Sequence, residues 1–374
     1  MDKIVKGWKF KVLVVVAIVV LATVFYEGYV LYAQNQKSSK ATLVIYTYGS
    51  LFNYGANPNE TKNIVFGTFE KKYNVNIDIE YPNNIMQALE SQKSNPQADI
   101  VIGLTNVEAP TAIEKGLLDP YNYTNDIPSF LINGLSNNHY LTPYEYSYLA
   151  IDYTMSFYNQ TKGNVSHSNF LNFLNSTWAK NLILESPLTD TTGLNFLMWQ
   201  IAFYEYVLHN NNWLSWWKSI KNYALIENDW STAFNLFTTT NNPQQLVSSY
   251  STDPAYEIYN NGAMNGTFSY NSTLSYYNNT YYGWETIFGI GIVHGSSHLL
   301  LDEEFINWFL SGTVQSQIPL NEWEYPANNT VTLPPAYKYA VNPSNVVPLN
   351  NYLTQQQIYS NMTSWLEQWQ LAMS

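Results

Sequence analysis

The chain has 374 residues, a formal net charge of −12 and only 12% charged residues, so neutral polar side chains must cover most of its surface. This length is typical of two domains of roughly 150 residues each. Binding of nucleic acid is not expected, because neutralising phosphate groups requires clustered Lys and Arg. The absence of cysteine excludes disulfides, cysteine nucleophiles, thiolate metal sites and a lipid-modified N-terminal cysteine.

The first forty residues carry a membrane signal. Four lysines come first, and about fifteen apolar residues follow at 12–26, which is the pattern of a signal segment or an anchor. The apolar character continues with interruptions to Tyr32 and nearly reaches the roughly 20 residues that span a bilayer. We expect residues 1–40 to form an uncleaved membrane anchor with its positive end inside, followed by a short tether. A cleaved signal peptide is the alternative, and Lys6-Gly7 resembles the processing site of some archaeal binding proteins.

This segment predicts a protein on the extracellular side of the cytoplasmic membrane. Asn-x-Ser/Thr sequons recur along the chain, as expected for an exported glycoprotein. A chain rich in Asn, Ser and Thr also forms such sequons by chance. Examples begin at Asn59, Asn122, Asn164, Asn175, Asn271 and Asn361.

Strands and helices alternate from residue 41 onward. Residues 41–48, 75–81 and 98–104 have the apolar or alternating pattern of strands. Helical spacing follows each of them, at 64–74, 84–94 and 111–116. This alternation predicts a parallel sheet with helices on both faces.

A second region of the same kind begins with a predicted strand at 145–154. It contains another strand at 181–187, and a long buried strand at 286–294 follows it. The segments with helical spacing are 193–207, 213–220, 230–237, 254–261, 302–312 and 355–373. The chain therefore reads as two α/β regions.

Enzyme signatures are weak in this sequence. No G-x-S-x-G turn, Walker loop or G-x-G-x-x-G follows a predicted strand. His294 and His298 are four residues apart but follow a strand, so a turn is favoured over a zinc site. Asp302, Glu303 and Glu304 are expected to form the negative first turn of a helix. Paired carboxylates beside Trp and Tyr leave a surface glycosidase as the enzyme alternative.

Aromatic residues beside small polar ones recur at the edges of predicted elements. Tyr48 ends the first strand, Trp230 opens a helix, and Trp323 lies in "NEWEYP". Tyr250 and Tyr256 flank the stretch "STDPA". Each alone is typical of core packing, but together they predict the lining of a cleft between two lobes.

Eight segments resemble, in the same order, consecutive segments of the thiamine-binding proteins that feed ABC importers. They run from about Leu43 to Met373: "LVIYTYGSLF", "QADIVIGLTN", "PYEYSYLAIDY", "PLTDTTGLNFLMWQ", "DWSTAFNLF", "SSYSTDPAYEIY", "QIPLNEWEYPANNTVTLP" and "WLEQWQLAM". The resemblance implies a binding protein, not an enzyme, that captures thiamine or its phosphates. It also implies delivery to an ABC permease and no cofactor or metal.

The implied fold is α/β and of the type II periplasmic-binding-protein kind. In this fold two α/β lobes close on the ligand around a hinge of crossing strands. The first lobe is expected at 41–146 plus 286–374, and the second at 147–285. The crossing strands match the segments 145–153 and 283–293.

The resemblance also assigns ligand-binding residues. Thiamine has a cationic thiazolium and a flat aminopyrimidine, which aromatic rings bind by stacking and cation–π attraction. Hydroxyl and carboxyl groups then bind the polar edges. The residues expected to bind the ligand are Tyr48, Ser50, Asn83, Asp190, Thr191, Trp230, Tyr250, Ser251, Thr252, Asp253, Tyr256 and Trp323.

Two aspartates depart from the family's pattern. The family commonly has serine where this chain has Asp190 and Asp253, at predicted helix starts whose N–H groups suit a phosphate. A carboxylate there competes for those donors, which predicts a preference for free thiamine or another organic cation over phosphorylated forms. In the alternative interpretation both aspartates only cap their own helices. An acidic-glycine pair of the family is also replaced near Asn83, which leaves recognition of the pyrimidine there open.

The same fold also serves binding proteins for iron(III) and for polyamines. Iron sites of this kind use paired tyrosinates, and Tyr276-Tyr277 and Tyr281-Tyr282 offer such pairs. We favour a Tyr-rich surface loop for these four residues. Iron(III) and polyamine nevertheless remain the alternative ligands.

Overall fold

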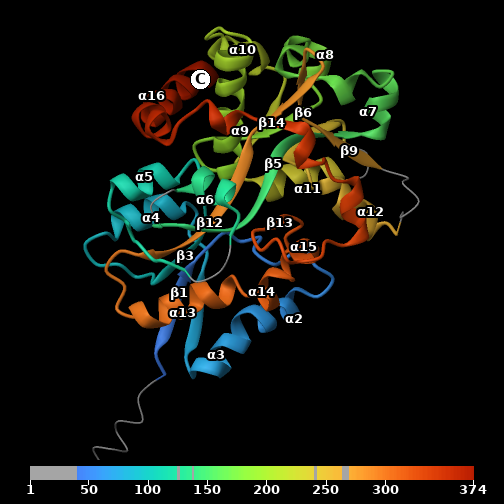
Figure 1. The fold of residues 1–374 in the computed structure, drawn as a ribbon. Coiled ribbons are helices and arrows are strands. Elements are labelled where there is room, and N and C mark those ends of the chain that lie inside the picture. The colour runs from blue at the N-terminus through green and yellow to red at the C-terminus, as the bar shows by residue number, and fades with distance from the viewer. Residues whose placement is uncertain (1–39, 124–126, 137–138, 240–241, 263–268) are drawn as a thin grey trace, which may run out of the picture.

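The computed structural model describes residues 40–123, 127–136, 139–239, 242–262 and 269–374. The predicted membrane anchor at 1–40 therefore lies, except for its last residue, outside the described residues. No helix in the described part of the chain is long and apolar enough to cross a membrane. The molecule has two lobes, and in Figure 1 the first lobe, with β1 and β3, is below the second, with α9 and α10.

One mixed sheet runs through both lobes, in the strand order β2-β1-β3-β12-β5-β8-β6-β7. Its strands are β1 (Thr42–Tyr46), β2 (Asn76–Glu80), β3 (Ile100–Thr105), β5 (Thr142–Thr154), β6 (Leu182–Glu185), β7 (Leu225–Glu227), β8 (Leu246–Tyr250) and β12 (Glu285–Val293). Pairing is parallel among β1, β2 and β3 and among β6, β7 and β8, but β12 runs antiparallel to β3 and β5. The prediction of parallel strands is thus confirmed within each lobe. It is wrong where β12 and β5 connect the lobes, because β12 pairs antiparallel with both of its neighbours.

Short strands extend this sheet and form a second one. The strands β4 (Leu118–Asp119), β9 (Tyr270–Thr273) and β13 (Tyr325–Pro326) pair at its margins. A separate three-stranded sheet contains β10 (Ser275–Tyr277), β11 (Thr280–Gly283) and β14 (Val346–Pro348). These short strands were not predicted, because segments of two to four residues carry little periodicity.

Helices cover both faces of the sheet. Those of the first lobe are α2 (Pro58–Lys62), α3 (Thr68–Tyr73), α4 (Ile85–Ser91), α5 (Ala109–Glu114), α6 (Ser129–Leu135), α13 (Leu299–Phe309), α14 (Gly312–Gln315) and α15 (Ile318–Asn321). Those of the second lobe are α7 (Met155–Gln160), α8 (Ser176–Ala179), α9 (Thr191–Ala202), α10 (Trp213–Ile220), α11 (Trp230–Thr238) and α12 (Asp253–Asn260). The last helix is α16 (Gln355–Met373).

The two longest strands of the sheet connect the lobes. β5 and β12 pair antiparallel from Glu285–Tyr148 to Ile290–Thr142, with an irregularity in register at Gly289. Every residue of β12 is buried, which explains the continuous apolar run in its sequence. The strands predicted at 145–154 and 286–294 are therefore confirmed, and both cross between the lobes in Figure 1.

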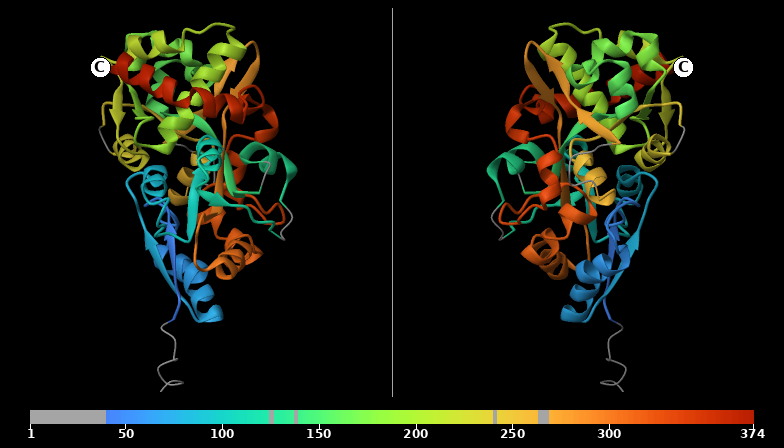
Figure 2. Two further views of the ribbon diagram at one scale, coloured as in Figure 1. Left: turned by 90° about the vertical axis from the view of Figure 1, so that its left-hand side faces the viewer. Right: turned by 90° about the vertical axis from the view of Figure 1, so that its right-hand side faces the viewer.

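Each lobe has its own hydrophobic core. The first core combines residues from 43–144 with residues from 287–327. The second combines Val107 and residues from 148–284 with residues of the C-terminal segment, among them Leu349, Ile358, Trp365 and Trp369. Accordingly, α16 packs on α10, and both side views in Figure 2 show it on the second lobe, away from α13. The division at 286–374 stays a prediction, but this packing favours placing residues 346–374 with the second lobe.

Candidate ligand-binding site

A cavity of about 840 Å³ lies between the two lobes. Loops after β1, β2 and β3 line it from the first lobe, and the loop after β6, the start of α11 and the end of β8 line it from the second. Loops that follow parallel strands meet at one edge of a sheet, which is where ligands bind in such folds. The volume is in the range of small-molecule sites.

Aromatic rings form much of the cavity wall. Tyr54 of the first lobe packs edge-on against Trp230 and Tyr256 of the second, with ring centroids 5.3 Å and 6.0 Å apart. Trp323 in turn lies 5.4 Å from Tyr256. The aromatic residues of the lining are Tyr48, Tyr54, Tyr81, Trp230, Phe234, Tyr250, Tyr256, Phe288 and Trp323. A flat ligand finds stacking partners on both lobes.

Carboxyl groups form the other part of the wall. Those that line the cavity belong to Glu108, Glu145, Asp190, Asp229, Asp253, Glu322 and Glu324. Among the described residues, no Lys, Arg or His lines it. A cavity bounded by one sign of charge concentrates ligands of the opposite sign, so the geometry favours a cation over an anion.

Tyr48 stands at the centre of the buried acids. Its hydroxyl oxygen is 3.1 Å from the hydroxyl of Tyr144, from Glu145 Oε1 and from Glu322 Oε2. Burial raises the pKa of Glu145 to about 8. Burial, together with the charge of Glu145, also raises the pKa of Glu322 well above its usual range. Gly103 is needed for this arrangement, because a Cβ on it would lie 2.4 Å from the Tyr48 ring.

Two bulky residues near Glu322 have left-handed backbone conformations. The φ angles are 60° at Trp323 and 55° at Phe52, a costly conformation for large side chains that persists only where the surroundings impose it. The Phe52 N–H donates to Glu322 Oε1, and Trp323 Nε1 donates to the carbonyl oxygen of Tyr54 at 3.1 Å. These contacts hold residues 322–324 in place at the cavity wall.

Asp190 caps the helix that follows it, as one of the two predicted interpretations requires. Its Oδ1 accepts the N–H groups of Thr192 at 2.8 Å and Gly193 at 3.1 Å. Its Oδ2 accepts the N–H of Trp230 at the start of α11, at 3.1 Å. A single carboxylate therefore occupies backbone donors of two helix starts that face the cavity.

Asp253 does not cap its helix, so that interpretation is wrong for this residue. Its carboxylate accepts the Tyr250 N–H at 3.1 Å and the Ser249 hydroxyl, both of which precede α12. Ser249 also accepts the Trp230 indole N–H at 2.9 Å. Burial raises the pKa of Asp253 to about 6. The acid thus faces the cavity and orients an aromatic wall through Ser249.

Ser251 and Thr252 lie behind the cavity lining, not in it. Both are fully buried, and their hydroxyl groups are 3.1 Å and 3.3 Å from the Ser147 hydroxyl. The Ser251 N–H donates to the carbonyl oxygen of Tyr148 at 2.9 Å. They join the end of β8 to the crossing strand β5. The loop that contains them does border the cavity, but their own side chains point away from it toward β5.

The remaining predicted residues come together around one cavity. They are Tyr48, Ser50, Asn83, Asp190, Thr191, Trp230, Tyr250, Asp253, Tyr256 and Trp323. The sequence missed Glu108, Glu145, Glu322 and Glu324. Two signals were available. Glu145 is one of only two charged residues in the predicted strand at 145–154, and Glu322 and Glu324 flank Trp323.

Comparison with known proteins agrees with this geometry. The chain is 26% identical over 340 residues to the thiamine-binding periplasmic protein of Escherichia coli strain K12, covering 90% of this chain and 94% of the relative. Identity to the protein of the same name in Brucella suis biovar 1 is also 26%, over 341 residues, covering 90% and 93%. The chain is similar in sequence to thiamine-binding periplasmic proteins over most of its length. No protein-family model matches it.

Solved structures show the same fold. A periplasmic thiamin binding protein superposes with a TM-score of 0.72 at 25% identity, covering 90% of this chain and 97% of that one. A periplasmic binding protein from Actinobacillus pleuropneumoniae, solved with fructose-6-phosphate, has a TM-score of 0.69 at 16% identity and covers 89% of this chain. The expected type II periplasmic-binding-protein fold is therefore confirmed.

The tyrosine pairs considered for iron(III) lie outside the cavity. Tyr276 and Tyr277 are in β10, Tyr281 and Tyr282 are in β11, and none of the four lines the cavity. The rings of Tyr276 and Tyr281 pack against each other with centroids 4.8 Å apart. Iron(III) and polyamine are not favoured, because the relatives are named for thiamine.

The two predicted surface histidines contact different aspartates. His294 Nδ1 is 2.7 Å from Asp119 Oδ1, and His298 Nδ1 is 2.9 Å from Asp99 Oδ1. In the described part of the chain, no group of three or more His, Cys, Asp or Glu side chains could hold a metal ion. The structure thus gives no support to the zinc alternative.

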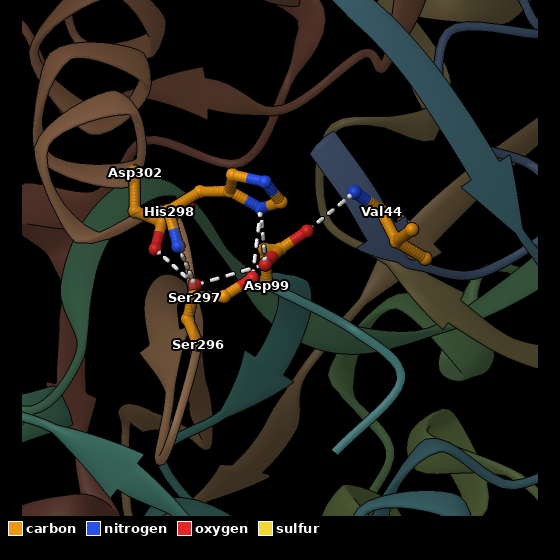
Figure 3. A network of polar contacts seen from close by, with 6 residues as sticks. All are labelled: Val44, Asp99, Ser296, Ser297, His298 and Asp302. Atoms are coloured by element: carbon orange, nitrogen blue, oxygen red, sulfur yellow. Dashed lines mark hydrogen bonds and ion pairs between the residues drawn. The ribbon is translucent and has the colours of Figure 1, made fainter. Parts of the chain in front are cut away.

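Figure 3 shows the Asp99 network, which consists of Val44, Asp99, Ser296, His298 and Asp302. Asp99 accepts the Val44 N–H at 2.8 Å and the Ser296 hydroxyl at 2.9 Å, besides its contact with His298. Asp302, which was expected only as a charge of the helix start, is fully buried and 2.6 Å from the Ser296 hydroxyl. Burial raises the pKa of Asp302 to about 7. Asp99 precedes β3, so the network lies at the opposite end of that strand from the cavity.

Proposed function

We propose that this protein is an extracytoplasmic solute-binding protein that captures thiamine and delivers it to the permease of an ABC transporter. The observation that carries the proposal is the cavity wall, which combines aromatic rings from both lobes with seven carboxyl groups and, among the described residues, no basic group. Homology to thiamine-binding periplasmic proteins supports the choice of ligand.

Thiamine matches this wall by its chemistry. Its flat rings suit stacking between Tyr54, Trp230, Tyr256 and Trp323, and its permanent positive charge suits the acids. Closure of the lobes around β5 and β12 would bury the ligand between them. Capture and release require no chemical change in the ligand, so we assign no catalytic residue.

The selectivity proposed is for thiamine over its phosphates. Backbone N–H groups at helix starts are the usual donors to a phosphate. Here the Asp190 carboxylate already accepts those of Thr192, Gly193 and Trp230. A phosphate would have to displace this carboxylate and would meet further acids at the cavity wall.

Calorimetry with thiamine and thiamine diphosphate at pH 7 tests both parts of the proposal. We expect thiamine to bind at least about tenfold more tightly than the diphosphate. Asp190→Ser should narrow this ratio, because serine caps the helix but leaves donors free and removes a charge. Asp78→Ser, at an exposed position of β2, is the matched control. Absence of thiamine binding would overturn the ligand, and tighter binding of the diphosphate would overturn the selectivity.

We also propose that the protein is held at the membrane by residues 1–40 and carries glycans. The basic and apolar pattern of that segment supports an anchor, and the names of the relatives place them in the periplasm. Of the sequons, those at Asn59, Asn122, Asn164, Asn175 and Asn361 have exposed asparagines and that at Asn271 is half-buried. Exposure is what a glycan acceptor needs.

A further inference from the structure

Two glutamates of the cavity wall each have one carboxyl oxygen without a hydrogen-bond partner. Glu145 is 1% exposed and Glu324 is 5% exposed, and both belong to the lining. The Oε2 atom of each has no hydrogen-bond partner among the described residues. Burying a carboxyl oxygen without a partner is costly. Because these two residues belong to the wall of a cavity, a ligand can supply the partner that the chain does not.

Proton counting around Tyr48 leads to the same conclusion. Its hydroxyl is 3.1 Å from both Glu145 Oε1 and Glu322 Oε2, but one O–H group can donate to only one of them. Both contacts are hydrogen bonds only if one carboxyl group is protonated and donates to the Tyr48 oxygen. In the free protein a proton therefore takes the place of a counter-charge.

Among the described residues, no cation forms an ion pair with these acids. The charge of Lys62 acts on Glu322, yet its ammonium group donates to Asn53 Oδ1 at 2.8 Å. The ionisable groups that face the three glutamates are Tyr48, Tyr144, Asp253, Tyr325 and Tyr337. All of them are neutral or negative, so in the described part of the chain a bound ligand is the group that can bring a positive charge into contact with these acids.

We propose that Glu145, Glu322 and Glu324 form an acidic base of the cavity that binds the positively charged ring of the ligand. This inference rests on the proposed function and adds the residues that recognise the positive charge of the ligand. Entry of the cation would ionise the acidic base, and the displaced proton would pass to the solvent. A neutral ring of the same shape would leave the carboxyl groups without a partner.

The backbone of residues 322–324 supports a built site. Glu322 and Glu324 flank Trp323, whose left-handed φ of 60° brings an aromatic ring and two acids to one wall. Trp323 is 4% exposed and packs against Tyr256 of the second lobe. One three-residue segment therefore supplies both the stacking surface and the charge that an aromatic cation needs.

Thiamine and 3-deazathiamine test whether the acidic base recognises charge. The second compound has a neutral thiophene ring in place of the cationic thiazolium but nearly the same shape. Binding of both to the full-length chain in detergent would be measured by calorimetry, for the wild type and for Glu145→Gln/Glu324→Gln. We expect the wild type to prefer thiamine by at least about tenfold. The double variant should lose most of this preference, while its affinity for the isostere changes less than about threefold.

A matched control is available on α12. Glu257 is 3% exposed, also has a partnerless Oε2 atom, and does not line the cavity. Glu257→Gln therefore makes the same change at a buried position outside the acidic base, and we expect it to keep the full preference for thiamine. If the double variant does not fold, as judged by its melting temperature, the two single variants provide the same comparison.

The outcomes distinguish the inference from the proposed function. A wild type that binds neither compound would overturn both. A wild type that binds thiamine and the isostere equally, or a Gln variant that keeps the full preference, would overturn only the acidic base. Loss of preference in Glu257→Gln as well would also overturn it, because the effect would then not be local to the cavity.

Discussion

The acidic base of the cavity and the Asp99 network both contain buried carboxyl groups, but Glu145 and Asp99 differ in the hydrogen-bond donors that surround them. Asp99 has the Val44 N–H and the His298 ring as partners, besides the Ser296 hydroxyl, which it shares with Asp302. Glu145 accepts from Tyr48, a donor that it shares with Glu322, and its Oε2 atom has no hydrogen-bond partner among the described residues. Buried charges that stabilise a fold need partners in the chain. A buried carboxyl group in a cavity wall that lacks hydrogen-bond donors within the chain can therefore bind a positively charged ligand.

Removing Asp99 should produce the largest effect on folding. Asp99→Ala leaves the Val44 N–H and the His298 ring without their acceptor, while Ser296 keeps Asp302, so we expect the free energy of unfolding to fall by about 3 kcal/mol. Thiamine affinity should not change, because the network is outside the cavity. Urea unfolding and calorimetry would measure the two quantities. Asp78→Ala, at an exposed position, should change stability by less than about 0.5 kcal/mol.

Removing the charge of Glu145 should have a smaller effect of opposite sign. Burial raises the pKa of this carboxyl from 4.5 to about 8, so its stabilising protonated form is complete below about pH 4.5 and is lost as pH rises through about 8. Glutamine cannot ionise. We therefore expect Glu145→Gln to be more stable than the wild type by about 1 kcal/mol at pH 8 and equal to it near pH 5.

Urea unfolding at the two pH values would measure this difference. Glu114→Gln, at an exposed position of α5, should show no difference at either pH. A Glu145→Gln variant that is less stable than the wild type at pH 8 would mean that Glu145 is balanced within the chain, as Asp99 is. The contrast between the two regions would then fail.

The sequence predicted those parts of the fold that have a strong local pattern. β12 reads as a continuous apolar run because all its residues are buried. β8 was missed, since Ser248 and Ser249 gave it a polar sequence. Those serines are nevertheless buried, and their hydroxyl groups donate to Glu185 and Asp253. Polarity in the sequence does not separate a solvated loop from a strand with buried polar pairs.

Local sequence patterns could not predict which distant segments pack together or which acidic residues are buried. The spacing of Ile358, Trp365 and Trp369 shows that α16 buries one face, but not which lobe receives it. Glu322 and Glu324 resemble ordinary surface charges in the sequence, because nothing local indicates that Tyr48 and Glu145 lie beside them. The aromatic residues of the cavity were easier to predict, because the resemblance to a family indicated which positions bind the ligand. Hydrophobic periodicity does not contain that information.

Proton release on binding tests the central claim most directly. Thiamine would be titrated into the protein at pH 7 by calorimetry in phosphate and in Tris, which have different ionisation enthalpies. If the ligand supplies the missing counter-charge, about one proton should leave the acidic base per thiamine bound. We expect the binding enthalpy of thiamine to differ between the two buffers by the difference in their ionisation enthalpies for about one proton. For the neutral isostere, the binding enthalpies in the two buffers should be equal. Equal enthalpies for thiamine in both buffers would contradict the account.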